Sequence, residues 1–393
     1  MGQGSAERRE SFLHTLASTV VWACLLFSLF PGYEGSNPLL LFAILVSFIA
    51  FVSGLLNGFR FEGRAAGYAL AMLCLAAIQL TGLFFVGDFF AIRYVFFVIA
   101  IAVFACCFVS GSLKPNANFV VGLGVAAISA RFIFYLFDDS SLDLKNTLSG
   151  ILVFVIAYMV YCHTRDCDEQ GVGFFRPRIR AGALLVSVVL AIVMIDIAKS
   201  RTALIVFLII ALTFMLLIKA KPSPKTLKIA FFVFIGLLFA ALFIYANAKS
   251  FGWYDFLNGY SVRIFGKNID SSRSALWMQA LDSLSSNYVF GLGTGVQPEG
   301  SFAGKSFHNS FLQLLVENGI VGLLVFLAAL YFLWAQISES PYPKSRAAAI
   351  AIFSGIIIYN CFESTLLCNK LSLGFIEWLL IASASCAPRE RKG

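Results

Sequence analysis

Three residues in the second half of the chain have side chains suited to acid–base and anion-binding chemistry. His308 lies at the start of a long apolar segment, where an imidazole with a reference pKa near neutrality can take a proton from a hydroxyl. Arg201 follows a short polar turn, and Arg273 opens a helical stretch within a polar loop. A guanidinium group suits phosphate oxygens because it can donate two parallel hydrogen bonds. These residue types predict a base beside an anion site.

Each of these residues also has a structural interpretation. His308 can cap a helix end, and the arginines can lie at a membrane interface or pair with Asp196 or Asp270. Arg131 differs, because a charge in the middle of an apolar segment is rare and usually functional. Glu317 follows His308 by nine residues, or about two and a half helical turns, so we expect it to face the interior of a helix bundle.

The elements that must position these residues are membrane helices. The chain has 393 residues, of which 60% are hydrophobic and only 13% charged, whereas soluble domains carry roughly 25% charged residues. Apolar runs of about 17 to 25 residues recur, and each can cross roughly 30 Å of hydrocarbon. A soluble helical protein would need polar residues at helical period within these runs, and they are absent. The composition predicts an all-α, polytopic integral membrane protein.

We predict about twelve transmembrane helices and one large loop between the ninth and the tenth. The predicted spans are residues 12–30, 39–56, 66–86, 91–110, 119–137, 147–162, 181–198, 202–218, 228–246, 310–334, 347–365 and 371–387. Residues 1–246 therefore hold helices 1 to 9, residues 247–309 the loop, and residues 310–393 helices 10 to 12 with a short tail. We expect these parts to form one integrated membrane domain.

The distribution of basic residues predicts the orientation. Alternate connections carry 18 of the 29 basic residues, among them Arg64, Lys221 and Arg346, while the other connections are acidic or mixed. Basic loops remain in the cytoplasm, so both termini are expected there and the 247–309 loop on the opposite side. The membrane topology thus accounts for the net charge of +8. This charge does not indicate nucleic-acid binding, which would need the charges on one folded face.

The long loop has structure of its own. It is rich in aromatic residues, and residues 274–285 show mostly helical spacing of apolar side chains after the capping residues Asp270 to Ser272. This pattern predicts a short amphipathic helix on or near the membrane surface. The glycines between Gly291 and Gly295 can cradle a phosphate or form a tight turn back to the membrane. We favour the turn, because known phosphate fingerprints follow a strand and none is predicted here.

We expect neither a metal nor another cofactor. Most of the nine cysteines lie inside predicted spans, and no Cys/His spacing is typical of zinc, although a bridge between Cys361 and Cys368 remains open. Asp166 and Asp168 form an Asp-x-Asp pattern like that of metal-dependent enzymes using nucleotide sugars. Their loop, from His163 to Arg180, is too short for a nucleotide-binding domain.

The segment from His308 to Leu323, HNSFLQLLVENGIVGL, resembles the signature of the O-antigen ligase/polymerase family of bacterial envelope glycosyltransferases. Ser200–Leu204 and Ser272–Trp277 are similar to the two short arginine motifs of that family. The motifs cover mainly Lys199–Leu204 and Asp270–Leu323, while the twelve predicted spans and the late loop are similar to the family's whole architecture.

The resemblance implies transfer of a glycan from undecaprenyl pyrophosphate, without nucleotide or metal, at the periplasmic face of the bacterial inner membrane. In the ligases of the family, the acceptor is the lipid A–core oligosaccharide of lipopolysaccharide. By resemblance, Arg201 and Arg273 bind the pyrophosphate and His308 is the base that activates the acceptor hydroxyl. Lys199 is a further candidate for donor binding. Asn309, Glu317 and Arg131 are candidate supporting residues.

Three other functions stay open. A polymerase of the same family would use the same donor, and a protein O-oligosaccharyltransferase would usually have a longer tail. The charges that we have not assigned, Arg131 among them, also permit a transporter of lipid-linked glycans, although the two halves show no repeat. The length, the span count and the short tail favour the ligase.

Overall fold

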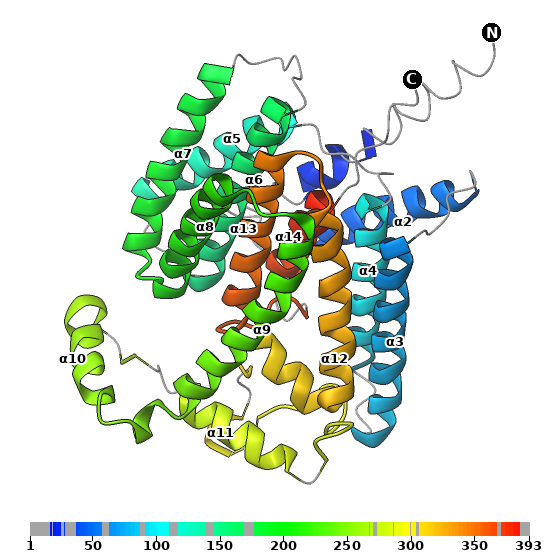
Figure 1. Ribbon diagram of the computed structural model, residues 1–393, viewed down its shortest axis with the longest axis vertical. Coiled ribbons are helices and arrows are strands. Elements are labelled where there is room, and N and C mark those ends of the chain that lie inside the picture. The colour runs from blue at the N-terminus through cyan, green and yellow to red at the C-terminus, as the bar shows by residue number, and fades with distance from the viewer. Residues whose placement is uncertain are drawn as a thin grey trace.

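The computed structural model describes residues 16–17, 19–24, 27, 37–56, 63–86, 91–109, 117–137, 145–168, 177–266, 268–269, 273–285, 287–298, 300–303, 306–367 and 371–385. Throughout this part of the chain, the regular elements are helices and there are no strands. Figure 1 shows long helices running roughly alongside one another, with the shorter α10 and α11 gathered at one end.

Eleven of the predicted spans are helical. They are α2 (Asn37–Leu56), α3 (Gly63–Val86), α4 (Ile92–Val109), α5 (Ala117–Phe137), α6 (Lys145–Asp168), α7 (Pro177–Ile197), α8 (Arg201–Ala220), α9 (Pro224–Ala246), α12 (Ser310–Ser338), α13 (Pro343–Asn360) and α14 (Leu371–Ala384). Among the described residues, seven helices are long and apolar enough to cross a membrane, namely α3, α5, α6, α7, α8, α9 and α12. The all-helical, polytopic class is confirmed. The count of twelve spans stays a prediction, and most of the 12–30 span lies outside the described residues.

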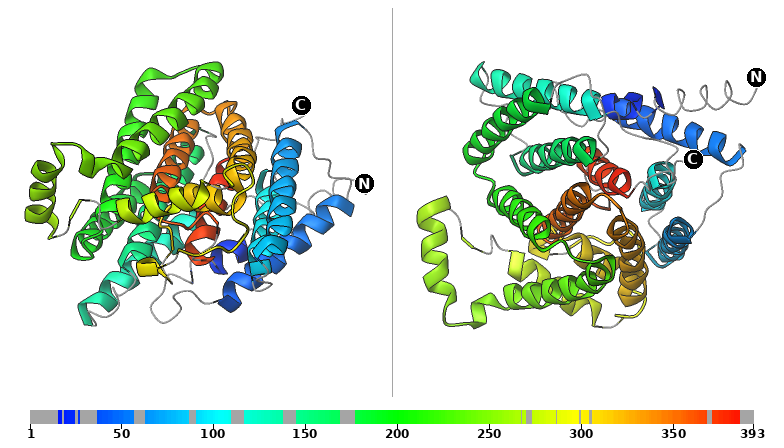
Figure 2. Two further views of the ribbon diagram at one scale, coloured as in Figure 1. Left: turned by 90° about the horizontal axis from the view of Figure 1, so that it is seen from below. Right: turned by 45° about the horizontal axis from the view of Figure 1, so that its top comes forward.

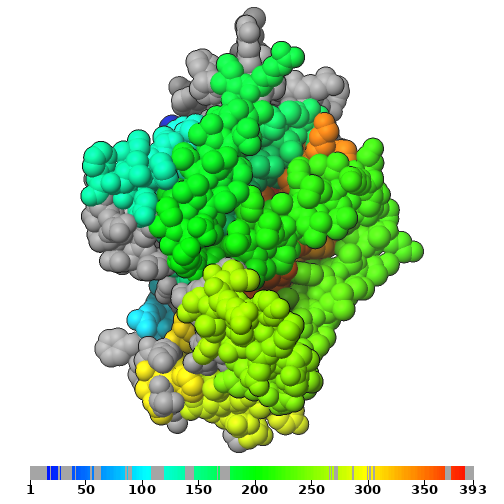
Figure 3. Space-filling model, turned by 90° about the vertical axis from the view of Figure 1, so that its left-hand side faces the viewer, coloured from blue at the N-terminus to red at the C-terminus, as the bar shows by residue number. Residues whose placement is uncertain are grey.

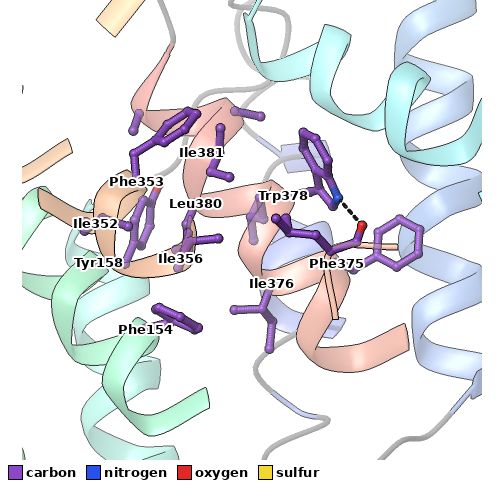
Figure 4. Packing of buried hydrophobic residues seen from close by; sticks show 14 of the residues in the cluster. Phe154, Tyr158, Ile352, Phe353, Ile356, Phe375, Ile376, Trp378, Leu380 and Ile381 are labelled. Atoms are coloured by element: carbon purple, nitrogen blue, oxygen red, sulfur yellow. Dashed lines mark hydrogen bonds between the residues drawn. The ribbon is translucent and has the colours of Figure 1, made fainter. Parts of the chain in front are cut away.

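The core lies where α6, α13 and α14 pack together, inside a ring of outer helices (Figure 2). Close-packed side chains such as Phe154, Tyr158 and Ile356 lie between these three helices (Figure 4). On the other side of α14, Trp378 packs against Tyr68 of α3 and Phe326 of α12. The indole of Trp378 satisfies its N–H by donating to the backbone oxygen of Leu366 at 2.9 Å. The outer helices α8 and α9 instead leave most of their apolar side chains at least partly exposed, as helices that face lipid do.

The helix α12 is broken at Gly319, where φ is 66° and ψ is −168°. A break leaves backbone groups without their partners within the helix, and these groups must be satisfied elsewhere. The loop segment 288–293 supplies the missing partners through four backbone hydrogen bonds of 2.8 to 3.2 Å. Leu292 and Gly293 donate to Val316 and Glu317, while Ile320 and Val321 donate to Tyr288 and Val289. The loop therefore enters the bundle and completes the broken helix.

This pairing explains the glycine-rich sequence. Gly291 has a φ of 78°, and a Cβ built there would lie 2.6 Å from the Gly319 nitrogen. A Cβ on Gly319 would lie 2.2 Å from the Val289 oxygen. The amides of Leu292 and Gly293 are committed to α12, so this part of the run forms the tight turn and not a phosphate cradle.

The described part of the loop contains two α-helices, of which one was predicted. The helix α11 (Arg273–Leu284) matches the predicted 274–285 helix, and its place on or near the membrane surface stays a prediction. Its apolar side chains Leu276, Trp277, Ala280 and Leu284 are buried, and the helix packs against α9 and α12. The unpredicted helix is α10 (Tyr254–Phe265), whose yellow-green surface lies below the green helices α7 and α8 in Figure 3. The capping residues 270–272 lie outside the described residues.

The helix α13 ends five residues before the predicted boundary at 365. The side-chain oxygen of Asn360 accepts hydrogen bonds from the backbone N–H groups of Thr365 (3.0 Å) and Leu366 (2.8 Å). These bonds turn the chain back on itself and stop the helix. Residues 361–366 form a turn that contains Glu363. The possible partner of Cys361, Cys368, lies outside the described residues.

Candidate functional site

The carboxylate of Glu363 is shared by two of the predicted site residues. Arg273 donates from Nη2 to Glu363 Oε1 at 3.0 Å, and His308 Nδ1 lies 3.5 Å from Glu363 Oε2. The Glu363 side chain is 6% exposed and that of Arg273 is 14% exposed, so their ion pair is largely shielded from water. The structure thus brings together residues from α11, from the start of α12 and from the turn after α13.

The side chain of Trp277 explains this convergence. It follows Arg273 by about one helical turn, and its ring packs against Tyr245 of α9 and against Phe362, the residue before Glu363. Its Nε1 donates to the backbone oxygen of Phe307, the residue before His308, at 2.9 Å. One buried indole therefore fixes the positions of α11, the start of α12 and the Glu363 turn relative to one another.

Arg201 lies in the same region as Arg273, close enough for the two positive charges to repel each other. Arg201 Nη1 donates to Ser261 Oγ at 2.7 Å and to the backbone oxygen of Asn268 at 3.0 Å, both in the loop. Asp196, considered above as its partner, instead pairs with Lys199 at 3.6 Å. The start of α8 therefore lies in the same region as the Glu363 cluster, with contacts to the α10 part of the loop.

Asn146, at the start of α6, connects the two halves of this region. Its Nδ2 donates to Glu363 Oε1 at 3.2 Å, and its Oδ1 accepts from Ser200 Oγ at 3.4 Å. Ser200 is the residue before Arg201. A single amide thus joins the arginine turn at the start of α8 to the carboxylate that holds Arg273.

The backbone around His308 orients its ring. His308 has a φ of 51°, an uncommon conformation for a residue other than glycine. Asn309 follows as the N-cap of α12, and its side chain accepts hydrogen bonds from the N–H groups of Phe311 and Leu312. The capping role considered above for His308 therefore belongs to Asn309. The His308 Nδ1 atom is buried while 38% of the side chain is exposed, so Nε2 is the accessible ring nitrogen.

Three further predicted site residues, Glu317, Lys199 and Arg131, lie in α12, in the turn before α8 and in α5. Glu317 is buried, as expected, and bonds to Gln313 Nε2 at 2.9 Å and to the backbone amide of Gly295. It therefore supports the break in α12. Lys199 is exposed in the turn before α8, with a φ of 52°. Arg131 is buried in α5, which packs against α6 and α7, so its supporting role stays a prediction.

Sequence reasoning missed Glu363 and Asn146. Glu363 lies near the end of a predicted span, a position that gives an acidic residue little predictive value. The signal that identifies it is a carboxylate at the same end of the bundle as a histidine and two arginines. In the described part of the chain, no group of three or more His, Cys, Asp or Glu residues can hold a metal ion, and Asp138 and Asp139 lie outside it.

Comparison with known families adds to this geometry. Residues 186–327 match the family model described as O-antigen ligase. These residues, just over a third of the chain, are similar to that family, which confirms the resemblance inferred from the sequence motifs they contain. The matched segment extends from within α7 to within α12 and contains Arg201, Arg273 and His308, whereas Asn146 and Glu363 lie outside it. No curated protein matches the chain.

Proposed function

We propose that the protein is an O-antigen ligase that transfers a glycan from undecaprenyl pyrophosphate to the lipid A–core oligosaccharide. The bacterial inner membrane is its proposed location, with both termini in the cytoplasm and the Glu363 cluster facing the periplasm. The observation that carries the proposal is the convergence of Arg273 and His308 on one carboxylate, with Arg201 nearby. An anion site and a base beside each other are what transfer from a lipid pyrophosphate requires.

The donor side of the reaction uses the arginines. Arg201, Arg273 and Glu363 together carry a net positive charge, which favours a pyrophosphate group. A guanidinium group has five N–H donors in a fixed fork, so Arg273 can hold Glu363 and still bind a phosphate oxygen. As the bond between the sugar and the pyrophosphate breaks, negative charge grows on the leaving oxygen, and these cations stabilise it. Lys199 adds a third, more exposed charge at the start of α8.

The acceptor side uses His308. Nδ1 faces Glu363, so a proton held there leaves the Nε2 lone pair free to take a proton from the acceptor hydroxyl. The hydroxyl oxygen then forms a bond to the anomeric carbon while the bond from that carbon to the pyrophosphate oxygen breaks. The proton stays on Nε2, and undecaprenyl pyrophosphate leaves. Direct attack opposite the leaving group inverts the anomeric configuration.

The separation of 3.5 Å between His308 and Glu363 suits a donor-free state. Catalytic hydrogen bonds are often long without substrate and shorten in the complex. When a pyrophosphate draws the positive charge of Arg273 toward itself, the carboxylate of Glu363 becomes a better acceptor for the histidine. Donor binding thus prepares the base.

The experiment that tests the proposal is glycan transfer by purified protein in nanodiscs. One reaction contains the lipid-linked donor and lipid A–core, and a second contains the donor alone. Product joined to lipid A–core supports the ligase, while a lengthened lipid-linked glycan without acceptor supports the polymerase. Movement of donor across vesicles without either product would support a transporter. We expect the ligase product, and we expect it to persist in EDTA because the arginines supply the positive charge that a metal would otherwise supply.

A further inference from the structure

A cavity of about 250 Å³ lies at the end of the bundle opposite the Glu363 cluster. It is bordered by the end of α8, the α8–α9 turn and the start of α13, whereas Arg201 and Glu363 lie near the other ends of α8 and α13. The 20 residues of α8 separate the two regions by roughly 30 Å. The cavity is several times larger than the roughly 30 Å³ that one water occupies in the liquid.

The lining of this cavity is apolar inside and positively charged at its rim. Leu227, Ala347 and Ile350 are buried side chains that line it, and the rim carries Lys221, Lys344 and Arg346. Such an arrangement suits a molecule with a charged head and an apolar body.

The surroundings of the three cations at the rim position Arg346 and the start of α13 without neutralising the positive charges. Arg346 donates to the backbone oxygens of Ser340 (3.1 Å) and Pro222 (3.4 Å), which joins the α12–α13 turn to the α8–α9 turn. The nearby carboxylate of Asp168 accepts from the backbone N–H groups of Lys344 and Ser345 and so caps α13. The ion pairs among the described residues include none of the three cations. Their combined charge is available to an anion.

We propose that this cavity binds the phosphodiester headgroup of an anionic phospholipid from the cytoplasmic leaflet. Basic pockets between membrane helices on the cytoplasmic side are suited to such headgroups. The acyl chains would extend along α8, which exposes Leu212, Met215 and Leu216 beside the lining residue Leu217. The inference uses the orientation given by the basic loops but is independent of glycan transfer, which is placed at the other end of the bundle.

Native mass spectrometry of delipidated protein with added phosphatidylglycerol or phosphatidylethanolamine tests this proposal. We expect one phosphatidylglycerol to be retained in preference to phosphatidylethanolamine. The variant Lys221→Gln/Lys344→Gln should weaken its binding at least about tenfold, because each basic residue contributes to the attraction. The matched control is Lys219→Gln/Lys225→Gln, which removes two exposed lysines from the same end of the bundle but outside the cavity lining. The control should bind as the unmodified protein does.

Three results would overturn the proposal. They are equal loss of binding in both double variants, unchanged binding in Lys221→Gln/Lys344→Gln, and equal retention of the two lipids.

Inorganic phosphate serves as a competitor. We expect it not to displace phosphatidylglycerol, since it cannot use the apolar part of the cavity, and displacement at equal concentration would assign the site to free phosphate. Thermal unfolding of each variant shows whether a loss of binding reflects a loss of fold.

Discussion

The His308 imidazole and the Glu363 carboxylate lie 3.5 Å apart, although the helices α12 and α13 separate them in the chain. The other oxygen of the same carboxylate accepts a hydrogen bond from Arg273. A change at Arg273, the proposed anion-binding residue, is therefore transmitted to the proposed base through one side chain. The first three predictions follow from this arrangement.

Replacing His308 by alanine should lower glycan transfer by at least about 100-fold, since a positioned general base typically contributes that much or more. Donor binding should remain, because the arginines are intact. Transfer rate and donor binding are measured separately on purified protein. His163→Ala in α6, at the opposite end of the bundle, is the matched control and should be active. Near-normal transfer by His308→Ala at equal expression would rule out its role as the base.

Replacing Arg273 by lysine should weaken both donor affinity and turnover. Lysine keeps the charge but loses the planar fork that reaches Glu363 and a phosphate oxygen together. Loss of one partner in a shielded charged contact costs roughly 2–5 kcal/mol. Arg201→Lys should behave similarly, and Arg263→Lys on the exposed face of α10 should have no effect. If Arg273→Lys retains full affinity and turnover, Arg273 serves only to anchor α11.

Replacing Glu363 by glutamine should reduce transfer although the protein folds. The amide keeps the size of the side chain but removes the negative charge that pairs with Arg273 and orients His308. Glu363→Asp keeps the charge with a shorter reach, so its activity should lie between those of the glutamine variant and the unmodified protein. The comparison uses turnover at saturating donor. Equal activity of all three proteins would show that the carboxylate only supports the fold.

How far the sequence predicts this site depends on the residue. His308, Arg201 and Arg273 could be identified because their types and motif context are unusual for apolar segments. Glu363 could not, because its importance comes from a turn that Asn360 creates by bonding to Thr365 and Leu366. The helical segments followed from apolar runs, but the break at Gly319 did not. It depends on hydrogen bonds to residues 288–293, which no local pattern reveals.

Replacing Gly319 by alanine should destabilise the protein strongly. Gly319 has a φ of 66° and a ψ of −168°, a conformation that essentially only glycine adopts and that costs another residue roughly 1–3 kcal/mol. A Cβ there would also lie 2.2 Å from the Val289 oxygen. We expect a total loss above about 2 kcal/mol, seen as a lower midpoint of thermal unfolding in detergent. The control is Gly236→Ala in α9, where a Cβ would meet nothing within 4 Å. Similar unfolding midpoints for the two variants would contradict the pairing between the loop and α12.

Acidification should weaken the contact between α3, α9 and the end of α12. The Arg64 guanidinium, and then Lys228, hold the pKa of the Glu339 carboxyl below its ordinary value. A lowered folded-state pKa contributes stability above the unfolded value of about 4.3, and this contribution is lost as the pH falls below it. The effect should be small, since Glu339 is 48% exposed. Unfolding midpoints at about pH 6 and pH 3.5 should differ less in Glu339→Gln than in the unmodified protein or in Asp282→Asn. Equal pH dependence in all three would show that Glu339 does not contribute.

The completion of α12 by residues 288–293 also sets an order of events during biosynthesis. The loop is translated before α12, yet it can pair with the break only after Gly319 has entered the bilayer. Between insertion of the helix and pairing with the loop, backbone groups on both sides of Gly319 would face hydrocarbon without partners, at a cost of several kcal/mol each. The newly inserted helix and the loop must therefore mature together. A protein arrested before that step would have all its membrane helices and no properly placed His308.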